Sequence, residues 1–412
     1  MLLALPNELV VGIVRALDGD VKALRNVALT SRALLPIAQE VLFEVANLRG
    51  LHRTCIHPYF SVINELRVVG KVEGMVCAIS KPPASLILYP HAFPKLKAIR
   101  LIYVGRLFYM RMSLSFLTAV TRLTALTELT LCGATFVNLG HIQSLIRSLA
   151  RLSRLSLSNI EFAQDMFPTS TYTPLPGHIP AVAAIRPKLA HLSIAPTNST
   201  MASAEVARWL GSGPSRDSLT TLVIAHLSEA PQVVLDCFGS SVEHLRMPLR
   251  DLDASTYSGY LDGYTSLRTV TVFLEAYNTS QGPWYLLAPF FERGIPTAEC
   301  LHTITIDVRI GYPMSLSSAI DWTVLNRLND ALDEDKFRAL QKVVVILQWR
   351  EALGWKPDWV ERETVARSVR ARLYNLDGEG KLEARLQTVE EFYDTIPGST
   401  YPDPDMERNR GW

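Results

Sequence analysis

The sequence predicts an α/β protein in which a small all-α module precedes a long array of strand-and-helix units. Two observations support this fold class. The first 45 residues contain three short amphipathic runs, and from residue 63 onward a six-residue motif with apolar residues at positions one, four and six recurs ten times. The motif starts are 23 to 39 residues apart. Ten such motifs at this spacing predict a repeat protein, whereas a single one would not.

The N-terminal module is predicted from the spacing of its apolar residues. Leu9, Ile13 and Leu17 are four residues apart, which is typical of one stripe of an amphipathic helix. Asp20 is placed to cap a second helix, and a third begins near Leu34. Three short helices bury too little apolar surface to be stable alone. The module is therefore expected to dock on something else.

This N-terminal stretch resembles the F-box, by which substrate receptors of SCF-type ubiquitin ligases hold the Skp adaptor. The matching positions are Leu5, Pro6, Glu8, Leu9, Ile13, Leu17, Leu24, Arg25, Val27, Ala28, Leu29, Ser31 and Arg32. Residues 33–36 (ALLP) depart from the commonest form, which places a tryptophan there, and resemble F-box proteins of mushroom-forming fungi. The alternative is an ordinary helical cap on the repeat domain.

The resemblance implies which residues contact the adaptor and, through it, the cullin. These residues are Leu5, Pro6, Glu8, Leu9, Ile13, Leu17, Leu24, Val27, Leu29 and Arg32.

The repeated motif predicts a short strand whose alternate side chains point into a core. Several linkers between motifs are expected to be helices, and these are residues 141–152, 204–210, 231–238 and 284–291. Strand, turn and helix at this period resemble leucine-rich repeats, which implies a horseshoe of parallel strands with outer helices. Ala134 and Ile160 stand where that family places asparagine or cysteine, so an irregular leucine-rich-repeat solenoid is expected.

Composition divides the chain into an F-box module at residues 1–50, a repeat arc at 51–349, a C-terminal cap at 350–396 and a polar, disordered tail at 397–412. Within these segments, residues 169–187 are expected to form a surface loop and 320–340 one long helix. Residues 363–373 are expected to form another helix and 381–386 a last strand. A solenoid needs a cap with one polar side, and the segment after residue 349 is the candidate.

Charge and cysteine content exclude several classes of protein. The 41 basic and 40 acidic residues leave no global field that would favour nucleic acid or an anionic membrane. Five scattered cysteines favour reduced thiols in the cytoplasm or nucleus. A signal peptide is not expected, and the absence of a long apolar run predicts a soluble protein.

The sequence contains no established catalytic motif, so no catalytic residue and no cofactor is expected. His52, Cys55 and His57, with Cys77 further along, could in principle bind zinc, but their spacing matches no standard arrangement. Residues 377–380 (DGEG) lack the oxygen ligands of a calcium loop and are expected to form a hairpin turn.

These observations predict a non-catalytic substrate-recognition subunit that binds the Skp adaptor through the F-box and a protein target through the repeat arc. Two alternatives stay open: an F-box scaffold outside a ligase, and an enzyme with an unrecognised site. Strand alternation places certain side chains on the face opposite the core, where they are candidates for target binding or for plain solvation. Those candidates are Glu65, Arg67, Arg100, Glu128, Arg154 and Arg246, and Arg67, Arg100 and Arg154 are expected to lie on adjacent strands and to bind an acidic or phosphorylated segment.

Overall fold

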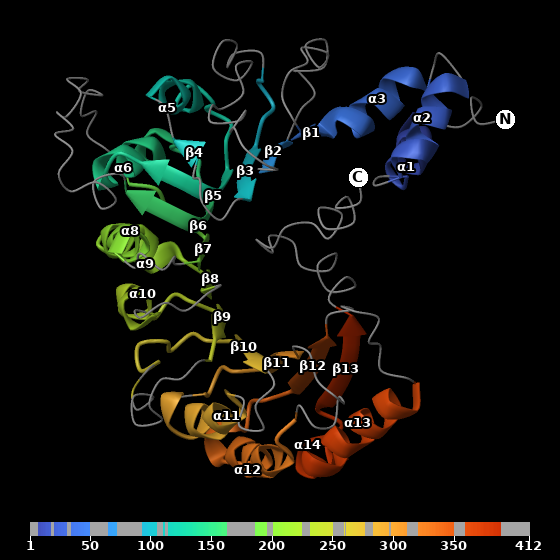
Figure 1. Cartoon of the computed structure of the whole chain (residues 1–412), viewed down its shortest axis with the longest axis vertical. Coiled ribbons are helices and arrows are strands. Elements are labelled where there is room, and N and C mark those ends of the chain that lie inside the picture. Colours follow the sequence, from blue (N-terminus) through green and yellow to red (C-terminus); the bar gives the residue numbers. More distant parts are fainter. Residues whose placement is uncertain are drawn as a thin grey trace. The chain divides into compact units, whose positions relative to one another are not determined.

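The architecture is known from a computed structural model of the 412-residue chain (Figure 1). The structure describes residues 7–17, 20–30, 34–49, 65–71, 93–104, 110–111, 114–162, 186–195, 201–224, 231–249, 259, 261–276, 283–295, 298–310, 320–349 and 359–388. The chain divides into two compact units, Met1–Pro187 and Lys188–Trp412, and each is considered by itself.

Unit 1 begins with three helices, as predicted. They are α1 (Asn7–Arg15), α2 (Val21–Thr30) and α3 (Leu35–Glu44). Asp20 caps α2, since its Oδ1 accepts a hydrogen bond from the amide of Ala23 at 2.9 Å. A small core holds the helices together, and its buried members are Val14, Leu24, Ala38 and Val41.

The sheet of unit 1 begins earlier than the sequence predicts. The strands are β1 (Val45–Arg49), β2 (Glu65–Lys71), β3 (Ala98–Val104), β4 (Met110–Arg111), β5 (Glu128–Phe136) and β6 (Arg154–Phe162). They are parallel in the order β1-β2-β3-β5-β6, and β4 pairs with β5. Because β1 pairs with β2, a boundary at residue 50 would cut into the sheet, and the helical module ends at Glu44.

The apolar positions of the repeated motifs point into the core of unit 1, as predicted. On β5 and β6 these residues are Leu129, Leu131, Leu155 and Leu157, and each is at most 1% exposed. Helices α5 (Leu114–Val120) and α6 (Leu139–Ser148) follow β4 and β5, and α6 buries Ile142, Leu145 and Ile146.

Ala134 and Ile160, which stand where the resemblance to leucine-rich repeats would place asparagine, are opposite each other in the ladder and fully buried. Both strands therefore continue for nine residues instead of turning after the motif. Gly133, which has a φ of 70°, supplies the left-handed backbone conformation in β5 that other residues rarely adopt.

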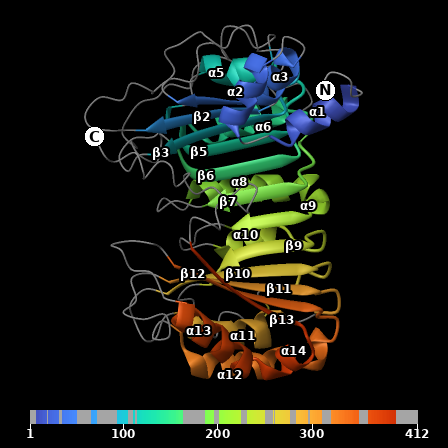
Figure 2. The same ribbon diagram turned by 90° about the vertical axis from the view of Figure 1, so that its right-hand side faces the viewer.

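Unit 2 repeats the same arrangement. Its strands are β7 (His191–Ala195), β8 (Thr221–Ile224), β9 (His244–Pro248), β10 (Thr269–Ala276), β11 (Thr303–Ile310), β12 (Lys342–Trp349) and β13 (Leu382–Thr388). They pair in parallel and in sequence order. Figure 2 shows these strands side by side. All ten predicted motifs of the chain thus end in parallel strands, and the expected last strand is β13.

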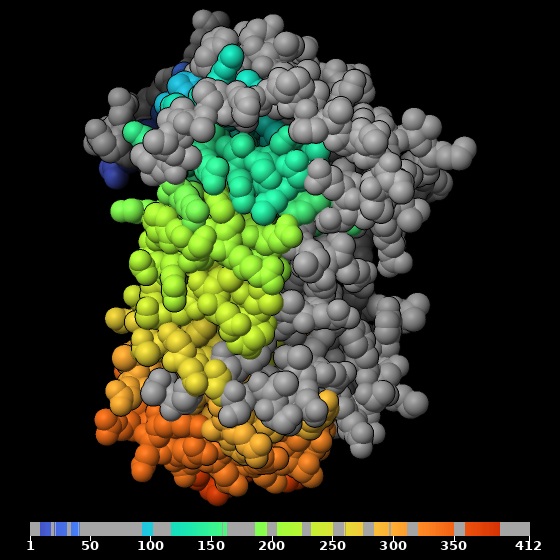
Figure 3. All heavy atoms as spheres, turned by 90° about the vertical axis from the view of Figure 1, so that its left-hand side faces the viewer, coloured from blue at the N-terminus to red at the C-terminus, as the bar shows by residue number. Residues whose placement is uncertain are grey.

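Helical segments link successive strands of unit 2. They are α8 (Met201–Gly211), α9 (Ser215–Ser218), α10 (Pro231–Cys237), η5 (Pro283–Leu286), α11 (Leu287–Pro289), η6 (Phe290–Gly294), α12 (Trp322–Leu332), η8 (Asp335–Phe337), α13 (Trp359–Arg372) and α14 (Tyr374–Gly378). Figure 3 shows residues of the segments from α8 to α12, green to orange, on the surface of one side. Buried side chains such as Phe291 and Phe337 join these segments to the core of the unit.

Two predictions about the secondary structure of unit 2 are wrong. Residues 320–340 do not form one helix, because α12 ends at Leu332 and a separate 3-10 turn follows at Asp335–Phe337. Residues 377–380 do not form a hairpin turn, because they link α14 to β13, which is parallel to β12. Gly380 has a φ of 69° at this helix end, which explains the glycine. The loop predicted at residues 169–187 lies outside the described residues as far as residue 185, and the tail at 397–412 lies outside them entirely.

Candidate functional site

Helix α1 presents apolar side chains on two faces. Val10 and Val14 are 5% and 3% exposed, whereas Leu9 and Ile13 are 55% and 46% exposed. Residues four apart lie on the same side of a helix, so Leu9 and Ile13 form one apolar stripe outside the core. Leu29 on α2 is 86% exposed. We call the stripe of Leu9 and Ile13 the apolar surface of the helical module.

The remaining residues predicted to contact the adaptor divide into two groups. Leu24 is buried in the core of the module, and Leu17 and Val27 pack against that core. These three residues support the module from inside, so Leu24 is corrected from a contact residue to a core residue. Leu5, Pro6 and Arg32, together with the side chain of Glu8, lie outside the described part of the chain.

The second candidate surface is the sheet face of unit 1 opposite the repeated leucines. Arg100 on β3 and Glu128 on β5 form an ion pair there, with 3.0 Å between Nη2 and Oε1, and each side chain is 23% exposed. Arg154 on β6 is opposite Glu128 in the register and is exposed. Strand alternation therefore places these residues on the predicted face.

The predicted arginine cluster on this face needs correction. Arg67 is opposite Arg100 in the register, but β5 separates β3 from β6, so Arg100 and Arg154 are not on adjacent strands. Arg154 belongs instead to the row that contains Glu128 and Ala98. Because Glu128 pairs with Arg100, the face carries mixed charge at this point, and Arg154 is an exposed cation beside that pair. The side chains of Glu65 and Arg67 lie outside the described residues.

Unit 2 carries a denser cluster on the corresponding face of its sheet. Phe273 on β10 lies between two guanidinium groups, with the Cζ of Arg246 5.7 Å and the Cζ of Arg309 5.6 Å from its ring centre. Asp307 on β11 is opposite Phe273 in the register. Its carboxylate accepts hydrogen bonds from Gln348 Nε2 at 2.6 Å and from Arg246 Nη2 at 3.4 Å. We call these five residues the Phe273 cluster.

Burial decides the electrostatics of the Phe273 cluster. Asp307 is only 1% exposed, and this burial raises the pKa of its carboxyl group above the ordinary value. The positive charges of Arg309 and Arg246 act in the opposite direction on the same pKa. Sequence reasoning identified only Arg246, because Phe273, Asp307, Arg309 and Gln348 lie beyond the six residues of each motif.

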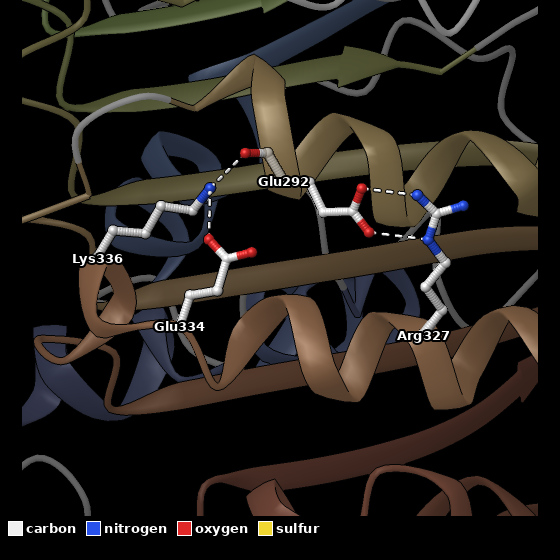
Figure 4. A network of polar contacts seen from close by, with 4 residues as sticks. All are labelled: Glu292, Arg327, Glu334 and Lys336. Carbon is white, nitrogen blue, oxygen red and sulfur yellow. Dashed lines mark hydrogen bonds and ion pairs between the residues drawn. The ribbon is translucent and has the colours of Figure 1, made fainter.

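A separate charged network lies among the helical segments of unit 2 (Figure 4). Arg327 on α12 donates two hydrogen bonds to the carboxylate of Glu292, at 2.8 and 2.7 Å. Lys336 donates to the backbone carbonyl of Glu292 at 2.6 Å and pairs with Glu334. The bonds from Arg327 hold the pKa of Glu292 below its usual value. This network joins η6, α12 and η8, so its role is structural.

The described residues contain no group of three or more histidine, cysteine, aspartate or glutamate side chains that could hold a metal ion. The four residues considered above as possible zinc ligands lie outside that part of the chain. They are His52, Cys55, His57 and Cys77. Within the same described ranges, no helix is both long and apolar enough to cross a membrane.

Comparisons with known proteins add little. No family model matches the chain, and no curated protein matches it. Among solved structures, the chain is similar to the crystal structure of the TLR13-ssRNA13 complex, with 10% sequence identity and a TM-score of 0.32. The match covers 85% of this chain and 57% of the TLR13 chain. This chain therefore spans less than two thirds of the length of the TLR13 chain. A likeness at that TM-score carries no argument about fold or function.

Proposed function

We propose that this chain is the non-catalytic substrate receptor of an SCF-type ubiquitin ligase. In this proposal the helices α1–α3 are an F-box that binds the Skp adaptor, and the parallel strands that follow belong to an irregular leucine-rich-repeat domain that binds a protein target. The observation that carries the proposal is the apolar surface of the helical module. Leu9 and Ile13 are about half exposed although Val10 and Val14 on the same helix are buried.

Leaving this apolar surface in water costs free energy. Apolar side chains left in water gain roughly 1.5–3 kcal/mol each when a partner buries them fully. Leu9, Ile13 and Leu29 all match F-box positions, and all three are exposed. The module has its own small core and still leaves these residues uncovered. A partner that supplies an apolar groove would cover them.

The receptor would perform no chemistry itself. It would raise the effective concentration of target lysines near the charged conjugating enzyme held by the cullin. On this proposal the protein acts in the cytoplasm or nucleus, and the exposed Arg154 and the Arg100–Glu128 pair on unit 1 contribute to target binding.

Affinity purification with mass spectrometry tests this function. The full chain is expected to recover the adaptor and the cullin together. Ile13→Asp is expected to lose both, because binding would bury an unpaired carboxylate. Lys22→Asp, at an exposed position on α2, serves as the control and is expected to retain both.

Two outcomes would count against the proposal. Recovery of the adaptor by Ile13→Asp would refute the F-box assignment. Recovery of the adaptor without cullin would favour a scaffold that acts outside a ligase.

A further inference from the structure

Strand β13 lies at one edge of the sheet of unit 2. It pairs with β12 on one side, and none of the described strands pairs with its other side. An edge strand carries a row of backbone N–H and C=O groups that can pair with a strand of another chain. Prolines and bulges often prevent such pairing, but β13 contains no proline and its register with β12 is continuous. The strand is therefore competent to pair again.

The hydrogen bonds to β12 show which backbone groups face the open edge. The amide of Val343 on β12 donates to the carbonyl oxygen of Lys381 at 2.8 Å, and Leu382 is opposite Val343 in the register. In a parallel ladder the residue opposite such a donor directs its own N–H and C=O groups away from that neighbour. By alternation, Leu382, Ala384 and Leu386 direct these groups toward the open edge.

The same three residues continue the apolar core as far as this edge. Their register partners on β12 are each at most 1% exposed, and these partners are Val343, Val345 and Leu347. The three residues of β13 are themselves only half-buried. The apolar row of the sheet therefore ends with side chains that a further strand would cover.

The opposite face of β13 carries two opposite charges. Glu383 accepts a hydrogen bond from Nε of Arg385 and pairs with Lys342 on β12 at 2.6 Å. These contacts lower the pKa of Glu383 to about 2, so its carboxylate is charged at neutral pH. Arg385 is exposed, and a guanidinium has four N–H donors besides Nε. It can therefore contact a second carboxylate without losing the first.

A second copy of β13 complements this edge when the two strands pair antiparallel about a two-fold axis at Ala384. The two Ala384 residues then exchange their outward backbone groups, and Leu382 lies opposite Leu386 of the second copy. Glu383 lies opposite Arg385 of the second copy. Moving the axis by one residue would place Glu383 opposite itself or Arg385 opposite itself, and like charges directly opposite each other are destabilising. The charges thus favour the register that also joins the apolar rows.

We propose that β13 is a self-association edge through which two copies of this chain form an antiparallel strand pair centred on Ala384. The axis is a two-fold, so the same residues contribute from both copies. One strand per copy buries less surface than a standard interface, so the expected dimer is weak, with a Kd in the micromolar range. The inference does not depend on adaptor binding.

Sedimentation equilibrium of the full chain tests this contact. The unmodified chain is expected to show a concentration-dependent equilibrium between monomer and dimer. Arg385→Glu places two carboxylates opposite each other at two symmetry-related positions, and Glu383→Arg does the same with two guanidinium groups. Each change is expected to raise the dimer Kd about 30-fold. Arg370→Glu, at an exposed position on α13, is the control and should leave the Kd unchanged.

Mixing the two charge variants makes the test specific for the register. In a mixed dimer, residues 383 and 385 of the Arg385→Glu chain are both acidic and face two arginines of the Glu383→Arg chain. The mixture is therefore expected to form a dimer under conditions in which each variant alone is monomeric. A fluorescent label on one variant identifies the mixed species, and its formation also shows that both variants are folded.

Three results would overturn the proposal. The first is an unmodified chain that stays monomeric at every concentration, as it would if another part of the same chain covered the edge. The second is a dimer that both charge variants retain. The third is the absence of a mixed dimer.

Discussion

The buried carboxylate of Asp307 offers a quantitative test of how the sheet face of unit 2 is stabilised. Gln348 is 1% exposed, and its Nε2 donates to Asp307 Oδ1 at 2.6 Å. Asp307→Ala removes that acceptor and leaves the buried side-chain amide of Gln348 without this hydrogen bond. The loss lowers the free energy of unfolding by about 1–3 kcal/mol. Asp307→Asn keeps an oxygen in the same place. We therefore expect Asp307→Ala to be less stable than Asp307→Asn by about 1–3 kcal/mol at pH 7.

The pH dependence of the same pair follows from the raised pKa of Asp307. A carboxyl group whose pKa is higher in the folded state than in the unfolded state adds stability below the unfolded pKa and loses it as pH rises through the folded pKa. The amide that Asp307→Asn introduces does not titrate. The free energy of unfolding of the unmodified chain should therefore rise relative to that of Asp307→Asn as pH falls through the folded pKa.

Urea denaturation followed by circular dichroism, at pH 7 and at two lower pH values, measures both effects. Equal midpoints for the Asp307→Asn and Asp307→Ala variants at pH 7 would show that the Gln348 contact contributes nothing. A loss of stability of the unmodified chain relative to Asp307→Asn on acidification would show that the arginines, not burial, dominate the pKa.

Two further predictions concern helix packing and capping in unit 2. Gly211→Ala should destabilise the protein by roughly 1–3 kcal/mol, because a Cβ would lie 2.5 Å from the backbone oxygen of Cys237 on α10. Gly378→Ala is its control in the same urea experiment, since nothing lies within 4 Å of that Cβ, and equal effects of both changes would refute the packing argument. Asp321→Ala should cost about 0.5–2 kcal/mol, because Asp321 Oδ1 accepts hydrogen bonds from the amides of Thr323 and Val324 at the start of α12. Asp321→Asn should retain most of that stability in thermal unfolding, and a full loss in this variant would contradict the cap.

Much of the fold could be predicted because its signals are local. In each motif the apolar residues at positions four and six, such as Leu129 and Leu131, alternate along one strand, and ten copies repeat the signal. β1 was not predicted because Val45–Arg49 carries no complete motif. This strand depends instead on its pairing with β2. The break after Leu332 also has no strong local signal.

The candidate sites were harder to predict because they depend on strand register. Asp307 and Gln348 are 41 residues apart in sequence, and their contact needs the pairing of β11 with β12. The same reason explains the misplaced arginine cluster, since motif order alone does not show that β5 separates Arg100 from Arg154. On α1, by contrast, helical periodicity alone was enough to place Leu9 and Ile13 on one side.

The most direct test of the proposed function is a calorimetric titration of the purified full chain with purified Skp adaptor. Leu9 and Ile13 are each about half exposed. Burying the exposed half of each side chain therefore contributes about 1 kcal/mol per residue to the free energy of binding. The double variant Leu9→Ala/Ile13→Ala should therefore raise Kd about 30-fold, whereas Lys22→Ala should leave Kd unchanged. An unmodified chain that does not bind the adaptor, or a double variant that binds as tightly as the unmodified chain, would contradict the assignment of α1–α3 as an F-box.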